Sequence, residues 1–213
     1  MSQKKFKGIS TVALHTAGHD NDSFSHTTPI YATSTFTFNS AEEGMERFKG
    51  EDKSKLYTRW GNPTFVAAEQ TIAALESHGL MNEQGEPLQL KALLHSSGQA
   101  AMTTLFFSNL SAGDTLISHY SLYGGSQELM QKVLAEAGVK IILIDIHDEA
   151  LLIETITANP STKLIHLETP ANPTLQCVDI QAICTIAKAH GIKVSVDNTV
   201  ATPYLQQPFA LGA

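Results

Sequence analysis

The sequence has few cysteines and no excess of positive charge, and both shortages exclude classes of protein. Two cysteines among 213 residues, Cys177 and Cys184, cannot build the disulfide framework of a small secreted domain. Because they lie seven residues apart around a helical pattern, we interpret both as buried, reduced thiols. The net charge is −7 and no basic cluster occurs, which argues against DNA or RNA as a partner.

Long apolar runs are also missing. No stretch approaches the roughly 18 apolar residues that a membrane-spanning helix needs. Lysines follow Met1, but the apolar segment of a signal peptide does not come after them. We therefore expect no membrane partner and a cytoplasmic location.

The nine histidines lack the spacing of a metal site. His15 and His19 are at helical spacing, but Gly18 lies between them and an acidic residue does not. Five further histidines are scattered through separate predicted segments: His95, His119, His147, His166 and His190. We therefore predict no metal ion.

From Leu90 onward, short apolar runs alternate with segments of helical periodicity. The predicted strands cover residues 90–95, 114–119, 140–144, 163–167 and 192–196, and the predicted helices cover residues 99–110, 126–137, 148–158 and 179–190. This alternation predicts an α/β fold with a mostly parallel sheet between helices. Gly138 and Gly191 follow two of the helices, where glycine commonly ends a helix.

The first sixty residues show a different pattern. Residues 1–60 are rich in Thr, Ser and Phe without a strong period, and we interpret them as an extended arm that packs on another subunit. Within the arm, the mixed charges of residues 42–55 predict a solvated helix and loop. A helix follows over residues 62–76, with Asn62 as its cap. We assign residues 61–213 to the main domain.

Three groups of polar residues follow predicted strands. In an open α/β sheet, ligands bind at the carboxyl ends of the strands. Ser96–Gln99 opens a helix, whose N-terminus suits an anion, but an ordinary capped helix start has the same pattern. Asp197–Thr199 offers a carboxylate for a cationic ring nitrogen, or a simple turn. Glu168–Pro173 offers the Asn172 amide, or a rigid surface turn.

Two tyrosines complete the candidates. Tyr123, in Leu122–Gly125, follows a predicted strand and suits stacking on a flat ring. Tyr57 precedes Arg59, and arginine suits bidentate contact with a phosphate, although an isolated pair of this kind is usually at the surface.

Taken together and in this order, the motifs resemble those of one enzyme family. They are Tyr57-Thr58-Arg59, Asn62-Pro63-Thr64, Ser97-Gly98, Tyr123-Gly124-Gly125, Glu168-Thr169-Pro170-Ala171-Asn172-Pro173, Asp197-Asn198-Thr199 and Thr202-Pro203-Tyr204-Leu205-Gln206. The sequence is similar, from about Ile9 onward, to the Cys/Met-metabolism pyridoxal-phosphate enzymes: cystathionine γ-synthase, cystathionine lyases, methionine γ-lyase and O-acetylhomoserine sulfhydrylase. The resemblance implies the large domain of fold-type I, with a mostly parallel seven-stranded sheet, complete or incomplete in this chain, and no C-terminal domain.

The resemblance also implies roles around pyridoxal 5'-phosphate. The backbone of Ser97, Gly98 and Gln99 would hold the phosphate. Tyr123 would stack on the pyridine ring and move protons. Asp197 would pair with the protonated ring nitrogen, which keeps the cofactor an effective electron sink.

Further cofactor contacts are implied for four residues. Thr199 lies beside Asp197, and Asn172 would approach the ring hydroxyl and the substrate carboxylate. Tyr57 and Arg59 would bind the phosphate of a neighbouring subunit. The resemblance therefore implies a homo-oligomer, a dimer paired again into a tetramer.

By resemblance, the reaction is γ-elimination or γ-replacement on a small amino-acid substrate. We favour the cystathionine γ-synthase, cystathionine γ-lyase or sulfhydrylase type, because Gly125 stands where methionine γ-lyases tend to carry cysteine and Gln99 is more like the sulfhydrylases. We expect the family's Schiff-base lysine, on a Ser-x-Thr-Lys stretch, beyond Ala213, so that this chain alone is inactive. The alternatives are a non-catalytic truncated protein, a methionine γ-lyase or an aminotransferase.

Overall fold

The computed structural model describes residues 8–16, 23–50 and 55–213. These residues form two compact units, of which the first ends at Leu94 and the second begins at His95. The helix predicted over residues 62–76 belongs to the first unit, together with the described part of the arm. Within the described ranges, no helix is long and apolar enough to cross a membrane.

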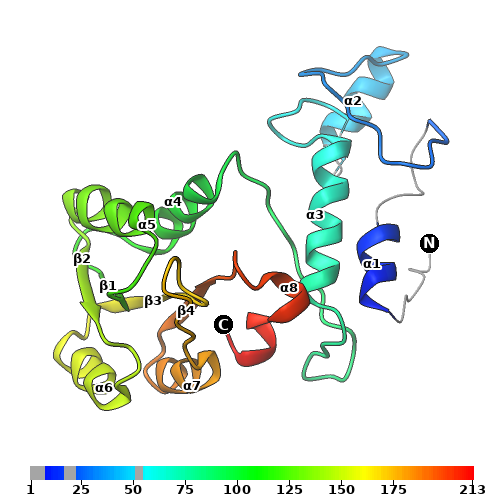
Figure 1. Cartoon of the computed structure of the whole chain (residues 1–213). Helices are drawn as coiled ribbons and strands as arrows, with labels where there is room; N and C mark the ends of the chain where they lie inside the picture. The colour runs from blue at the N-terminus through cyan, green and yellow to red at the C-terminus, as the bar shows by residue number, and fades with distance from the viewer. Residues whose placement is uncertain (1–7, 17–22, 51–54) are drawn as a thin grey trace. The chain divides into compact units, whose positions relative to one another are not determined.

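The second unit is built on a parallel four-stranded sheet (Figure 1). Its strands are β1 (Thr115–His119), β2 (Lys140–Ile144), β3 (Thr162–Glu168) and β4 (Lys193–Asp197), in the spatial order β2-β1-β3-β4. All three pairings are parallel, so all four strands end at the same edge. This arrangement confirms the predicted α/β fold and places β3 between the loops that follow β1 and β4.

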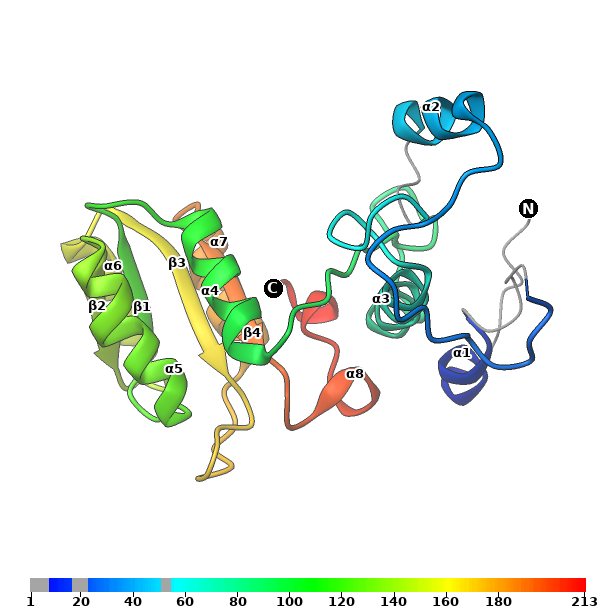
Figure 2. The same cartoon turned by 90° about the horizontal axis from the view of Figure 1, so that it is seen from above.

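Helices cover both faces of this sheet. The helices are α4 (Gly98–Asn109), α5 (Gly124–Glu128), the π-helix η1 (Leu129–Leu134), α6 (Glu149–Ala158), α7 (Ile180–Ala189), α8 (Thr202–Leu205) and the 3-10 helix η2 (Pro208–Leu211). α4 and α5 lie on one face, and α6 and α7 lie on the other (Figures 1 and 2). Successive strand residues therefore face different cores: Leu164 packs with Phe106 of α4, whereas Ile165 packs with Ile183 of α7.

Local sequence explains where several helices begin and end. The side chains of Ser97, Asp148 and Asp179 each accept a backbone N–H three residues on, which caps α4, α6 and α7. Gly138 and Gly191 take φ values of 88° and 68°, a left-handed conformation that favours glycine. The helix ends predicted at these two glycines are therefore confirmed.

Two sequence-based expectations were wrong. Residues 90–95 form no strand, because a strand needs a neighbour for its N–H and C=O groups and none of the described segments pairs with them. Leu93 remains 70% exposed there, so the apolar pattern of residues 90–95 did not indicate a buried strand. The helix predicted over residues 126–137 is present, and it switches to π-type hydrogen bonding at Leu129–Leu134. Cys177 is exposed, and only Cys184 of the two cysteines is buried.

The first unit contains α1 (Ile9–His15), which was not anticipated, α2 (Ala41–Lys49) and α3 (Pro63–Glu76). Asn62 caps α3 by accepting the N–H of Thr64 at 2.9 Å, as predicted. The Asn62 amide also donates to the Tyr31 carbonyl at 2.9 Å, which ties the arm to α3. Several arm side chains nevertheless lie open, with Phe24 96% and Ile30 84% exposed.

Candidate functional site

The carboxyl edge of the sheet brings two acidic residues side by side. Glu168 ends β3 and Asp197 ends β4, and the two are paired in the strand register. Thr169, the next residue of β3's loop, donates its N–H to the Asp197 carbonyl at 3.3 Å. The edge chosen from the sequence as the ligand-binding edge therefore carries polar groups on adjacent strands.

Glu168 connects the loops that follow β1 and β3. Its side chain is 4% exposed, and its two oxygens accept the backbone N–H groups of Tyr123 and Asn172, each at 2.8 Å. Two of the expected cofactor contacts are thus joined by a residue that had no assigned role in the sequence analysis. The sequence pattern that could have indicated Glu168 is an acidic residue at the end of a buried strand, directly before a proline-rich loop.

Tyr123 stands at the N-cap position of α5 and remains 48% exposed. Its side chain packs closely over the glycine at position 125. A Cβ built on Gly125 would lie 2.7 Å from Gln99 Nε2 and 2.7 Å from Tyr123 Cε1, well inside contact distance. Gly125 therefore allows the Gln99 amide and the Tyr123 ring to share one space, and a cysteine at 125 would displace both.

The first turn of α4 offers an anion site of the predicted kind. Ser97 Oγ accepts the N–H of Ala100 at 3.1 Å, and the first-turn N–H groups of Gly98 and Gln99 have no partner within the helix. A Cβ built on Gly98 would meet nothing within 4 Å, so the space around this turn is open. Gln99 Nε2 is buried without a hydrogen-bond partner.

Asp197 is held in a defined orientation by Thr199. The Thr199 N–H and hydroxyl donate to Asp197 Oδ1 at 3.0 and 2.5 Å. Below this pair, on the same face of the sheet, His166 Nδ1 contacts Ser195 Oγ at 2.9 Å. Burial lowers the pKa of His166 to about 4, although the Asp197 charge opposes the shift, so His166 is neutral at physiological pH.

Tyr57 and Arg59 lie together in the first unit. The Arg59 guanidinium sits 5.1 Å from the centre of the Tyr57 ring, a cation–π contact, and the Arg59 side chain is exposed. The structure thus brings this pair together, and brings the other candidate residues together in the second unit. Phosphate binding by Tyr57 and Arg59 remains a prediction.

The residues of the second unit fit pyridoxal phosphate. Open N–H groups at the start of α4 suit its phosphate, the half-exposed Tyr123 ring suits its pyridine face, and the oriented Asp197 carboxylate suits a protonated ring nitrogen. The unpartnered amide of Gln99 adds a donor beside Tyr123. Several polar groups at this edge therefore still have hydrogen-bonding capacity for a ligand.

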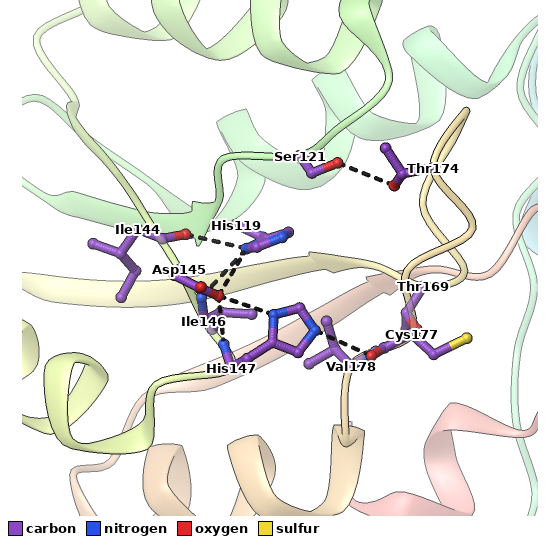
Figure 3. A network of polar contacts seen from close by, with 10 residues as sticks. All are labelled: His119, Ser121, Ile144, Asp145, Ile146, His147, Thr169, Thr174, Cys177 and Val178. Carbon is purple, nitrogen blue, oxygen red and sulfur yellow. Dashed lines mark hydrogen bonds and ion pairs between the residues drawn. The ribbon is translucent and has the colours of Figure 1, made fainter.

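Beside this edge, a second polar cluster joins the loops after β2 and β3 (Figure 3). His119, Asp145 and His147 offer ligand atoms within 4.8 Å of one another, a convergence that the sequence analysis did not anticipate when it predicted no metal. The His147 ring contacts Asp145 Oδ1 at 2.9 Å through Nδ1 and the Cys177 carbonyl at 3.2 Å through Nε2.

Those two contacts favour a proton on His147 over a metal ion. Both partner atoms of the His147 ring are acceptors, and a neutral imidazole has a single N–H to donate. The imidazolium can donate to both, and the hydrogen bond that it donates to Asp145 accordingly raises the pKa of His147 above its ordinary value of 6.5. The same bond lowers the pKa of Asp145. The absence of a metal ion remains a prediction.

We expect a pH-dependent contribution of His147 to stability. Because its folded-state pKa is raised, the contribution is complete below the unfolded value of 6.5 and is lost as the pH rises through the folded-state pKa. In an NMR titration, the His147 midpoint should lie above 6.5 and should fall in Asp145→Asn. The stability difference from His147→Gln should shrink over the same pH range. A midpoint at or below 6.5 that Asp145→Asn leaves unchanged would contradict this expectation.

Comparisons with known proteins agree with this fold. The model of the family described as "Cys/Met metabolism PLP-dependent enzyme" matches residues 10–213. An L-methionine γ-lyase from Porphyromonas gingivalis is 39% identical over 97% of this chain and 49% of its own length. A cystathionine β-lyase from Lactococcus lactis is 41% identical over 87% of this chain and 43% of its own length.

Among solved structures, a cystathionine γ-lyase from Lactobacillus plantarum complexed with L-serine superposes with a TM-score of 0.80 and 35% identity, over 97% of this chain and 48% of that one. The chain spans about half the length of the curated relatives that it matches. Because the family match extends over nearly all of the sequence, the chain belongs to the Cys/Met metabolism PLP-dependent enzyme family.

Proposed function

We propose that the protein containing this chain catalyses γ-elimination or γ-replacement on a small sulfur-containing or homoserine-derived amino acid, with pyridoxal phosphate as cofactor. One observation carries the proposal: the buried Glu168 ties Tyr123 and Asn172 together on the sheet edge that also ends in Asp197. This edge presents a ring, an amide and a carboxylate to one ligand. A relative's structure with L-serine supports an amino-acid substrate.

Each residue of the edge has a distinct task in this proposal. When bound, pyridoxal phosphate supplies an electron sink that stabilises negative charge at the substrate's Cα and Cβ. The first turn of α4 binds the phosphate through backbone N–H groups. Asp197 holds a proton at the ring nitrogen, and Thr199 keeps that carboxylate oriented. Tyr123 stacks on the ring and moves a proton at its phenol oxygen, while Asn172 orients the substrate carboxylate.

The test compares substrates on the full-length protein. O-acylhomoserine with cysteine or with sulfide reports γ-replacement of the synthase or sulfhydrylase type, and cystathionine alone reports a lyase. Product formation with any of these supports the proposal. If none reacts while a keto-acid acceptor is aminated, the protein is an aminotransferase. If the full-length protein neither reacts nor binds pyridoxal phosphate, the non-catalytic alternative holds.

Methionine γ-lyase is the second candidate. Relatives of that name, from Porphyromonas gingivalis and Treponema denticola, are 39% and 38% identical to this chain. The close packing of Gln99, Gly125 and Tyr123 supports the first candidate instead, because the cysteine that we associate with methionine γ-lyases at position 125 would require the Gln99 or Tyr123 side chain to shift. Release of methanethiol from methionine by the full-length protein would establish the second candidate.

We further propose that the protein acts in the cytoplasm as a dimer, paired into a tetramer, whose sites are shared between subunits. The exposure of Phe24, Ile30 and Trp60 in the first unit supports a subunit interface there, because large exposed apolar side chains commonly mark interfaces. The exposed Arg59 supports a charge-assisted contact with a partner's phosphate.

Replacing Arg59 by alanine should weaken retention of pyridoxal phosphate in the full-length protein. An arginine–phosphate pair contributes about 1.5–3 kcal/mol, so the expected loss of affinity is about tenfold to a hundredfold. A titration followed by cofactor absorbance measures it. Arg47→Ala is the matched control, because Arg47 is engaged within its own chain by Glu43 and by the Lys55 carbonyl.

Mixed dimers test whether the site is shared. A dimer of one Arg59→Ala subunit with one Asp197→Ala subunit has both lesions in one composite site and leaves the other intact. We expect the mixture to regain one site with wild-type cofactor affinity and activity, which neither parent has. A mixed dimer as defective as its parents, or a fully active monomer, would rule the shared site out.

A further inference from the structure

Glu168 is placed to act on two separate loops at once. It ends β3, which lies between β1 and β4, so its side chain lies where the loop after β1 and the loop after β3 meet. Tyr123, at the end of the first loop, is 45 positions away in sequence, and Asn172, in the second, is 4 positions away. Both loops carry residues that the proposed function places against the ligand.

The two N–H groups that Glu168 accepts have no alternative partner in the described structure. Tyr123 precedes the first turn of α5, so its N–H lies outside the hydrogen bonding of that helix. In the loop Pro170–Pro173, the two prolines have no N–H, and Ala171 donates instead to the Gln176 carbonyl. Without Glu168, the N–H groups of Tyr123 and Asn172 would lose their protein acceptor, and both of these hydrogen bonds are partly buried.

The chemistry of this position calls for a carboxylate. The two N–H donors approach from different directions, and each binds a different oxygen of Glu168. Both oxygens of a carboxylate act only as acceptors, which matches two donors. A glutamine would turn an NH₂ group toward one of the two donors. An aspartate is one methylene shorter and would not reach both. Among the described residues, no lysine or arginine pairs with Glu168, so these two N–H groups account for its hydrogen bonds.

We propose that Glu168 is a positioning residue, which sets the Tyr123 ring and the Asn172 amide against the bound ligand by accepting both of their backbone N–H groups. The proposal rests on the proposed function for the identity of the ligand. The two hydrogen bonds themselves, which we call the clamp, join only residues of this chain and can be tested separately from the ligand.

Backbone amide exchange in the full-length protein tests the clamp directly. In Glu168→Gln, at least one of the Tyr123 and Asn172 amides should exchange about tenfold to a hundredfold faster, and in Glu168→Ala both should. Glu168→Asp, if Glu168→Ala fails to fold, should release one of the two. Glu154→Gln, the same change at an exposed position of α6, is the control and should leave both amides protected. Wild-type protection of both amides in Glu168→Gln and Glu168→Ala would overturn the proposal.

A second measurement separates positioning from simple stabilisation. The visible circular dichroism band of bound pyridoxal phosphate reports the asymmetric contacts of the ring, and we expect it to weaken or change sign in folded Glu168→Gln. If Glu168 only stabilised the fold, Glu168→Gln would lower the unfolding midpoint and leave this band unchanged. That result would overturn the positioning role. If wild-type full-length protein binds no pyridoxal phosphate, the proposed function fails, while amide exchange still decides whether the clamp exists.

Discussion

Replacing Asp197 by asparagine should lower the affinity of the full-length protein for pyridoxal phosphate by about a hundredfold to a thousandfold. Removing one partner of a partly buried, hydrogen-bonded charge pair costs about 2–5 kcal/mol, and the middle of that range corresponds to this change in affinity. The structure supports such a cost, because Thr199 orients the carboxylate and the nearby His166 is neutral. The cofactor's ring nitrogen would then be the main cation that Asp197 meets.

Asp148→Asn is the matched control for this substitution. Asp148 caps α6 through its side-chain oxygen, and asparagine is an equally good cap, so fold and cofactor binding should both persist. Affinities are measured by titrating the apoprotein and following cofactor absorbance. Similar affinities of Asp197→Asn and the wild type, within about twofold, would show that Asp197 does not contact a cationic ring.

Replacing Phe106 by alanine should destabilise the second unit by about 3–5 kcal/mol, the usual cost of removing a fully buried phenylalanine. Phe106 is 0% exposed and packs in the core that α4 and η1 form on one face of the sheet. Its neighbour Phe107 points outward and is 48% exposed. Phe107→Ala is therefore a matched control on the same helix and should cost less than about 1 kcal/mol. Denaturant unfolding, followed by fluorescence and circular dichroism, measures both.

The same substitution should change the titration of His166. The Phe106 ring packs edge-on against the His166 ring, with centroids 5.1 Å apart. A cavity in place of Phe106 would admit water, and the pKa of His166 should rise from about 4 toward its ordinary value, because burial is the main cause of its depression. An unchanged His166 midpoint together with an unchanged unfolding free energy would show that Phe106 does not seal this side of the sheet.

Glycine and cap residues let the sequence predict helix boundaries within one or two positions. Asp148, Asp179, Gly138 and Gly191 act through their own backbone neighbourhood, and that neighbourhood is encoded within a few residues. The strand predicted over residues 90–95 is absent for a related reason. An apolar run is compatible with a strand, but whether the strand forms depends on pairing with segments far away in sequence.

By itself, the sequence determined the family, the order of the motifs and the parallel α/β core. These properties follow from local periodicity and from residue types at fixed spacing. Only the tertiary structure decided which residue holds the site together. Glu168 bonds to Tyr123 across 45 positions, and His147 bonds to Cys177 across 30. Such partners are chosen by the order of strands in the sheet, and hydrogen bonds between distant loops leave no periodic trace in the chain.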